Sequence, residues 1–244
     1  MKQPRLVPRP WLPSDANTAK LCHISPTGEV AGMALSKAKF YQGMTPSQYM
    51  EQIKVNKQPF LDIYQAVAVP EEARAFFSGL AAPLRVAVFT ADWCGDALST
   101  TPAVLRLAAA SDSLEARVFN RDQELDLTNS FLPEHRHSTV PVFVVLDAGM
   151  GEVARFIETA RSLVPELEAM HHAVAQQTAP AEGDGGSQAR GRRTAYRVAH
   201  ARQWGRIILR EFQATVAAGL ALPAGQRPAE GGTQWPPPDQ SEEG

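Results

Sequence analysis

The segment that most constrains the fold is a short apolar run, Leu84 to Phe89, which leads directly into a turn that contains a cysteine. The run is rich in valine and too short for a typical helix, so it predicts a buried strand. The turn covers Thr90 to Gly95, and an Ala- and Leu-rich helix, interrupted by Pro102, is predicted over 97–110. A buried strand that passes through a tight turn into a helix is the first half of a βαβ unit.

The predicted elements on either side extend this unit. Thr45 and Pro46 are typical of a helix start. The threonine side chain accepts a hydrogen bond from a free N–H group of the first turn, and proline lacks an N–H that would have no partner at the first helical position. The helix that follows is expected to break near 57–59, and a second short helix covers 70–79. The elements after the first strand and helix are a strand over 115–120, a helix over 123–131, a strand over 140–146, a hairpin turn over 147–151, a strand over 152–157 and a helix over 163–176. The order β-α-β-α-β-β-α predicts an α/β fold with a mixed sheet and helices on both faces.

The rest of the chain is divided by its composition. Segments rich in glycine, serine and glutamine are typical of linkers, and segments rich in proline, glycine and acid are typical of disorder. The expected organisation is an irregular arm over 1–43, a domain with an N-terminal helical pair over 44–177, a flexible linker over 178–192, an amphipathic basic helix over 193–221 and a disordered tail over 222–244.

Composition excludes several classes of protein. Apolar residues make up 44% of the chain, enough for a normal core, and a net charge of −2 predicts neither nucleic acid nor membrane as a partner. Two cysteines, Cys22 and Cys94, are too few for a disulfide-stapled secreted scaffold, and prolines interrupt the N-terminus before any apolar signal segment, so a cytoplasmic location is expected. No metal is expected: Cys22-His23 lacks a second ligand pair, and the adjacent His171 and His172 point about 100° apart on a helix.

The residues around Cys94 resemble the thioredoxin-like family. Val86 to Asp96 forms a buried strand and a WCGD turn, Pro102 follows eight residues after the cysteine, and Pro141 opens the next strand 47 residues after it. This resemblance covers 84–176 and implies a thioredoxin-like three-layer fold with extra N-terminal and C-terminal helices. More narrowly, 44–220 resembles a bacterial subgroup with a WCGD turn, an N-terminal helical pair and a basic C-terminal helix.

Cys94 is the candidate catalytic residue. It comes just before a helix, where free N–H groups and the helix dipole favour a thiolate, whereas Asp92 and Asp96 oppose the thiolate by like-charge repulsion. The sequence therefore predicts a lowered but not extreme pKa for the Cys94 thiol; the alternative is that Cys94 is a small buried hydrophobe. The neighbours that complete the candidate active-site turn are Trp93, Gly95, Asp96 and Ala97.

Two positions depart from the family pattern. Ala97 replaces the second cysteine of a CxxC motif, and Val88 stands where dithiol thioredoxins carry a buried acid. The resemblance then implies a monothiol protein that takes part in thiol–disulfide exchange through Cys94, with release by an external thiol, rather than a general dithiol reductase; no cofactor is expected. The alternative is a non-redox module that binds peptides or proteins on the same scaffold. A third hypothesis makes Cys22 a distant resolving thiol.

Two further segments are candidate binding surfaces. The resemblance implies that Val140-Pro141 is a cis peptide facing Cys94, and that Thr139 and Val140 pair with an extended substrate; the alternative is an ordinary trans proline. The second candidate is the basic segment over 190–210, for which three interpretations are open: a solvated face, pairing with acids elsewhere in the chain, or docking of an acidic partner. No nucleic-acid-binding motif accompanies it. Its arginines are Arg190, Arg192, Arg193, Arg197, Arg202, Arg206 and Arg210, of which the last three repeat every four residues.

Overall fold

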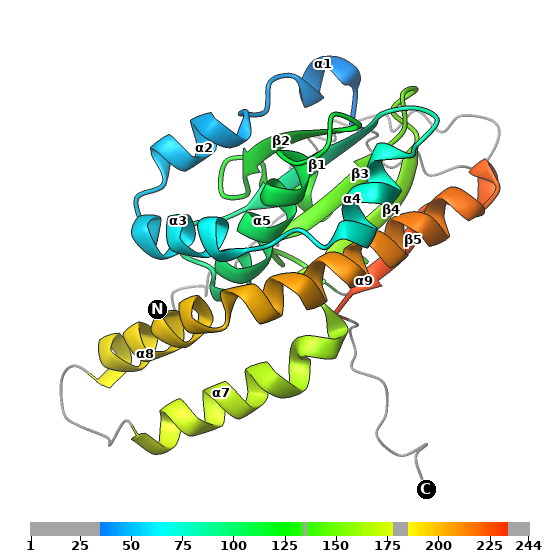
Figure 1. The fold of residues 1–244 in the computed structure, drawn as a ribbon. Helices are drawn as coiled ribbons and strands as arrows, with labels where there is room; N and C mark the ends of the chain where they lie inside the picture. The colour runs from blue at the N-terminus through cyan, green and yellow to red at the C-terminus, as the bar shows by residue number, and fades with distance from the viewer. Residues whose placement is uncertain (1–34, 134–135, 178–184, 234–244) are drawn as a thin grey trace, which may run out of the picture. The chain divides into compact units, whose positions relative to one another are not determined.

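The computed structural model of the chain describes residues 35–133, 136–177 and 185–233 (Figure 1). Most of the expected arm, including Cys22, lies outside the described residues, as do 178–184 of the expected linker and 234–244 of the expected tail. The described end of the arm is not irregular throughout, because it contains the short helix α1 (Lys37–Phe40). Ser36 caps this helix by accepting a hydrogen bond from the Lys39 N–H.

The predicted order of elements from the first strand to the last helix of the domain is confirmed. Those elements are β1 (Leu84–Thr90), α5 (Gly95–Ala108), β2 (Leu114–Asn120), α6 (Leu125–Asn129), β3 (Val142–Leu146), β4 (Glu152–Ile157), the short 3-10 helix η1 (Arg161–Leu163) and α7 (Val164–Gln177). Between α1 and β1 lie the helices α2 (Pro46–Gln52), α3 (Lys57–Ala66) and α4 (Glu71–Ser78).

The helix start at Thr45 is confirmed, and the break that follows it is displaced. The Thr45 hydroxyl accepts a hydrogen bond from the Gln48 N–H, and Pro46 occupies the first helical position. The break falls at 53–56 instead of 57–59. Pro59 lies in the first turn of α3, where the N–H that proline lacks has no partner within the helix, so it does not interrupt this helix.

The sheet is mixed, as expected, with strand order β2-β1-β3-β4-β5. β1 and β2 are parallel, whereas β3 is antiparallel to both β1 and β4. The fifth strand, β5 (Ala229–Gly232), pairs parallel to β4 and comes from the segment expected to be disordered. β1 therefore lies inside the sheet, and the turn that holds Cys94 follows its carboxyl end.

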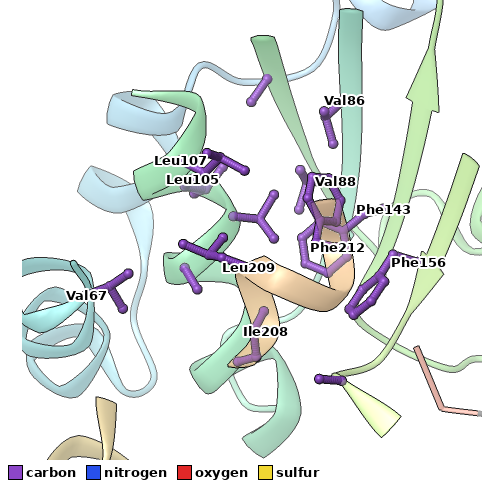
Figure 2. Packing of buried hydrophobic residues seen from close by; sticks show 14 of the residues in the cluster. Val67, Val86, Val88, Leu105, Leu107, Phe143, Phe156, Ile208, Leu209 and Phe212 are labelled. Carbon is purple, nitrogen blue, oxygen red and sulfur yellow. The ribbon is translucent and has the colours of Figure 1, made fainter. Parts of the chain in front are cut away.

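Alternate residues of β1 enter two hydrophobic cores on opposite faces of the sheet. Val86 and Val88 belong to the larger core, which includes residues of α3, α5, α7 and the C-terminal helix α9 (Ala201–Ala221) (Figure 2). Ala87 and Phe89 belong to the second core, where residues of α1 and α6 cover the sheet. The expected three-layer architecture, with helices on both faces, is thus present.

The basic helix expected over 193–221 is longer and divided. α8 (Gly185–Ala199) ends just before His200, which caps α9, so the prediction of a flexible linker is wrong for 185–192. Glycine and serine lower the intrinsic helix propensity here, but tertiary contacts override it. Within this stretch Ala189 packs against the larger core, and Arg192 Nη1 donates to the Gln177 side-chain oxygen at 3.0 Å. Farther along α8, the Arg197 side chain is buried.

The amphipathic character expected of the C-terminal helix is confirmed for α9. Trp204, Ile208, Phe212 and Val216 are all buried in the larger core, and Figure 2 shows Ile208 and Phe212 within it. In the described part of the chain, no helix combines the length and apolar character needed to cross a membrane.

The prediction of a disordered tail is wrong for 222–233. This segment forms a short 3-10 helix, η2 (Ala224–Gln226), and then β5, which adds to the β4 edge of the sheet. Gly232 has φ +84°, and a Cβ there would lie 2.1 Å from the Ile157 carbonyl oxygen. Glycine in this segment therefore permits a close approach to β4. From composition alone, the same glycines indicated a flexible segment.

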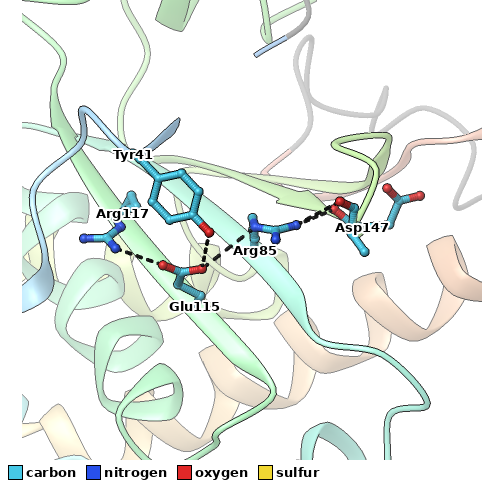
Figure 3. A network of polar contacts seen from close by, with 6 residues as sticks. Tyr41, Arg85, Glu115, Arg117 and Asp147 are labelled. Atoms are coloured by element: carbon cyan, nitrogen blue, oxygen red, sulfur yellow. Dashed lines mark hydrogen bonds and ion pairs between the residues drawn. The ribbon is translucent and has the colours of Figure 1, made fainter. Parts of the chain in front are cut away.

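A polar network joins the elements at the end of the sheet opposite the cysteine turn (Figure 3). Glu115 on β2 accepts a hydrogen bond from the Tyr41 hydroxyl at 3.1 Å and pairs with Arg117 at 2.9 Å and Arg85 at 3.8 Å. Arg85 also donates to the Asp147 carbonyl at 3.2 Å in the β3–β4 turn. This network links the segment after α1 to β1, β2 and the β3–β4 turn.

Candidate functional site

The candidate site begins where β1 ends. Cys94 is the N-cap residue of α5, with extended backbone angles and no side-chain capping hydrogen bond. The Asp92 carboxylate accepts hydrogen bonds from the Lys54 and Val55 N–H groups at 2.9 and 3.0 Å. These bonds anchor the turn to the connection between α2 and α3. Asp92 therefore has a structural role, whereas the sequence suggested only that its charge opposes the Cys94 thiolate.

Trp93 lies at the surface beside Cys94. Its side chain is 49% exposed, and its indole Nε1 donates to the Asp122 carboxylate at 3.0 Å. The Arg121 guanidinium stands 4.9 Å from the ring centroid, within cation–π range. These two contacts hold the indole against the residues that follow β2, so its exposed part borders the turn.

The structure brings Cys94 together with the proline segment named from the sequence. The Val140–Pro141 peptide bond is cis, and the Cys94 thiol donates a hydrogen bond to the Val140 carbonyl at 3.4 Å. Val140 and Pro141 are buried, whereas Thr139 is half-buried. Within the described residues, the N–H groups of Thr139 and Val140 form no hydrogen bond. The arrangement sets a thiol beside backbone donors that an extended ligand can use.

The expectation of a lowered pKa for the Cys94 thiol is wrong. Burial raises the pKa of this thiol above its ordinary value, and the Asp96 carboxylate adds to the rise. The backbone N–H groups of Ala97 and Asp96 and the positive charge of Arg197 act in the opposite direction and are outweighed. Sequence position identified the helix start correctly, but the desolvation of the sulfur depends on what packs around it.

Arg197 is the residue of the site that the sequence did not single out. Its Nη2 lies 3.2 Å from Asp96 Oδ1, and its Nη1 donates to the Ser99 hydroxyl at 2.9 Å. The guanidinium lies close to Gly95, where a Cβ would come within 3.0 Å of Nη2. In the sequence, Arg197 is one of a run of arginines and nothing distinguishes it from the others. The one local indication that another side chain packs against the turn is Gly95.

The two positions that depart from the family pattern are both buried. Ala97 is 2% exposed and Val88 is fully buried. Nearby, the Thr90 and Thr101 hydroxyls lie 3.0 Å apart, and burial raises the pKa of Tyr49. Among the described residues, no group of three or more His, Cys, Asp or Glu is arranged to hold a metal ion.

The arginines that repeat along α9 differ in their environments. Arg202, Arg206 and Arg210 are all exposed. Arg210 pairs with Glu72 of α4 at 3.1 Å, which is the pairing with an acid elsewhere in the chain that the sequence left open. Arg202 and Arg206 form no ion pair with any described residue.

Comparison with known proteins gives one family match and two structural matches. A family model described as thioredoxin matches residues 43–171. A crystal structure of a protein of unknown function from Pseudomonas aeruginosa is 17% identical with a TM-score of 0.48, covering 67% of this chain and 95% of that one. An HIV epitope scaffold is 16% identical with a TM-score of 0.48, covering 76% of this chain and 97% of that one. No curated protein matches the chain significantly.

Proposed function

The chain belongs to the thioredoxin family, and from this premise we propose that it is a monothiol member that exchanges disulfides through Cys94. The observation that carries the proposal is the contact between the Cys94 thiol and the Val140 carbonyl at 3.4 Å. A disulfide aligned along Thr139 and Val140 would lie next to the sulfur. The WCGD turn, the helices before β1 and the basic α8 and α9 support the narrower assignment to a bacterial subgroup, acting in a reducing cytoplasm.

The exchange needs two balanced steps and no cofactor. The Cys94 thiolate attacks one sulfur of a disulfide RS–SR, the S–S bond breaks, and RS⁻ leaves and takes up a proton. An external thiolate then attacks the R sulfur of the mixed disulfide, and Cys94 leaves as a thiolate that is reprotonated. Ala97 offers no thiol for an internal release, so the second step depends on the external thiol.

The raised pKa of Cys94 sets the expected kinetics. A smaller fraction of Cys94 is thiolate at neutral pH, which slows the attack. A thiol of high pKa is also a poor leaving group, which slows release from the mixed disulfide. If the proposed exchange takes place, Cys94 therefore forms mixed disulfides slowly and these are long-lived, in contrast to those of a rapidly cycling reductase.

The test uses a Cys22→Ser protein, so that Cys94 is the one remaining thiol, and a matched Cys22→Ser/Cys94→Ser protein. Both are incubated with glutathione disulfide, and intact mass and peptide mapping are used to locate the adduct. We expect one glutathione attached to Cys94, removed again by added reduced glutathione, and none on the double variant. Absence of the adduct on Cys94 under conditions that modify a free cysteine would refute the exchange.

A non-redox binding module is the second candidate, and the raised thiol pKa favours it. In this case the unbonded N–H groups of Thr139 and Val140 bind an extended peptide, and the exposed Arg202 and Arg206 contact an acidic part of the partner. Partners isolated with the protein under full reduction would then bind the Cys94→Ser variant with unchanged affinity. Loss of all of them in that variant would argue against the module.

A further inference from the structure

A pocket lies beside the Cys94 turn, on the side of α8. Trp93 and Gly95, the two neighbours of Cys94, form one part of its wall, and His171 of α7 and Arg193 of α8 form another. Its volume is about 410 Å³. Small-molecule sites typically enclose about 300–1,000 Å³, so this pocket suits a small molecule.

The pocket carries an unbalanced positive charge. Arg190, Arg193 and Arg197 line it from one face of α8, at the i, i+3, i+7 spacing that aligns helical side chains. Asp96, the sole acid among the described lining residues, is already paired with the buried Arg197. The side chains of Arg190 and Arg193 form no ion pair or hydrogen bond with any described residue.

The neighbouring histidine reports the same field. Burial lowers the pKa of His171, and the positive charges of Arg197 and Arg193 lower it further, with Asp96 acting in the opposite direction. Arg193 and Arg197 are thus close enough to His171 to disfavour its charged form. Guanidinium groups present a planar fork of donors that matches carboxylates.

We propose that this pocket binds the carboxylates of a small anionic disulfide, so that Cys94 acts on disulfides whose halves are acidic. Arg190 and Arg193 pair with the carboxylates, Thr194 and Asn56 supply neutral hydrogen-bonding groups, and the exposed ring of Trp93 contacts the apolar part. The substrate class rests on the exchange proposed for Cys94, whereas carboxylate binding does not depend on it.

The first experiment measures binding without chemistry. S-methylglutathione, which carries two carboxylates and no reactive sulfur, is titrated calorimetrically into Cys94→Ser protein, and into the same protein with Arg190→Ala and Arg193→Ala. We expect the two substitutions to weaken binding by about tenfold or more, since each removes a charge-assisted contact. The matched control, Arg74→Ala with Arg161→Ala, removes two exposed arginines outside the pocket lining and leaves affinity unchanged. Esterifying both probe carboxylates weakens binding like the pocket substitutions.

Equal affinity of the pocket variant and the control, or no saturable binding at all, would overturn the proposal. Both pocket arginines lack partners in the described structure, so the variant is expected to fold, and its thermal transition is recorded. Arg193→Gln is the milder substitute if that transition is lost.

A second experiment separates this proposal from the exchange. Rates of Cys94 modification by glutathione disulfide and by neutral hydroxyethyl disulfide are compared in protein with and without the pocket arginines. We expect the substitutions to slow only the acidic disulfide, by about tenfold. If neither disulfide modifies Cys94 while the thioether probe still binds, the exchange fails and the carboxylate pocket stands; equal slowing of both disulfides refutes the pocket.

Discussion

Arg197 and Asp96 stand 101 residues apart in the chain, and they meet with a guanidinium-to-carboxylate distance of 3.2 Å beside the Cys94 turn. The pair brings opposite charges to the same sulfur: Asp96 raises the pKa of the Cys94 thiol and Arg197 lowers it. Because α8 supplies the cation and α5 the anion, the packing of a C-terminal helix sets the charge balance at the thiol.

Replacing Arg197 with alanine should make Cys94 less reactive. The substitution leaves the Asp96 charge without its counter-ion, so the thiol pKa rises and alkylation by iodoacetamide at neutral pH slows. It also removes the partner of the buried Ser99 hydroxyl, with a loss of about 1–3 kcal/mol in the free energy of unfolding. Alkylation rates against pH and urea denaturation test both effects. Arg202→Ala is the control, and equal thiol reactivity in the two variants would contradict this role.

Replacing Asp96 with asparagine should act in the opposite direction on the thiol. Removal of the like charge lowers the Cys94 pKa, so alkylation becomes faster at neutral pH. The amide still accepts a hydrogen bond from Arg197, so the fold is retained. The same alkylation assay, with the exposed Asp112→Asn as the control, provides the measurement. A slower reaction would show that the Asp96 charge is not what opposes the thiolate.

The raised pKa of Cys94 predicts a specific pH dependence. Because the folded state holds the thiol proton more tightly than the unfolded state, the associated stability is fully present below about pH 8.5, the ordinary thiol value, and is lost as pH rises through the folded-state value. Unfolding free energy should thus fall more steeply with alkaline pH in the parent protein than in Cys94→Ser. Identical slopes would mean that the thiol titrates normally.

Truncation tests the role of the C-terminal segment. Ending the chain after Leu222 removes β5 and exposes the edge of β4. It also removes the hydrogen bond from Arg136 to the Thr233 carbonyl at 3.0 Å. We expect a loss of at least about 1–3 kcal/mol in the free energy of unfolding. Ending the chain after Thr233 serves as the control and should leave denaturant midpoints unchanged. If both truncated proteins unfold at the parent midpoint, β5 contributes nothing to stability.

Local patterns in the sequence were sufficient for the order of the elements in the domain. The run Leu84 to Phe89 predicted a buried strand because both of its faces are apolar, and both are buried in the structure. Thr45 and Pro46 predicted a helix start because capping is a short-range interaction. The pairing of Cys94 with Val140 came from family spacing, since no local rule connects residues 46 positions apart.

Local sequence patterns were enough to predict the order of strands and helices from β1 to α7 and the position of Cys94 at the start of α5, because those features depend on neighbours along the chain. The raised pKa of the Cys94 thiol, the ion-pair partner of Asp96 and the structure of 222–233 depend instead on tertiary contacts. All three depend on contacts between distant segments: the burial of the Cys94 sulfur, the ion pair of Arg197 of α8 with Asp96, and the packing of Gly232, at φ +84°, against Ile157. Those contacts exist only after the chain has folded, and they override the composition of the segments that make them.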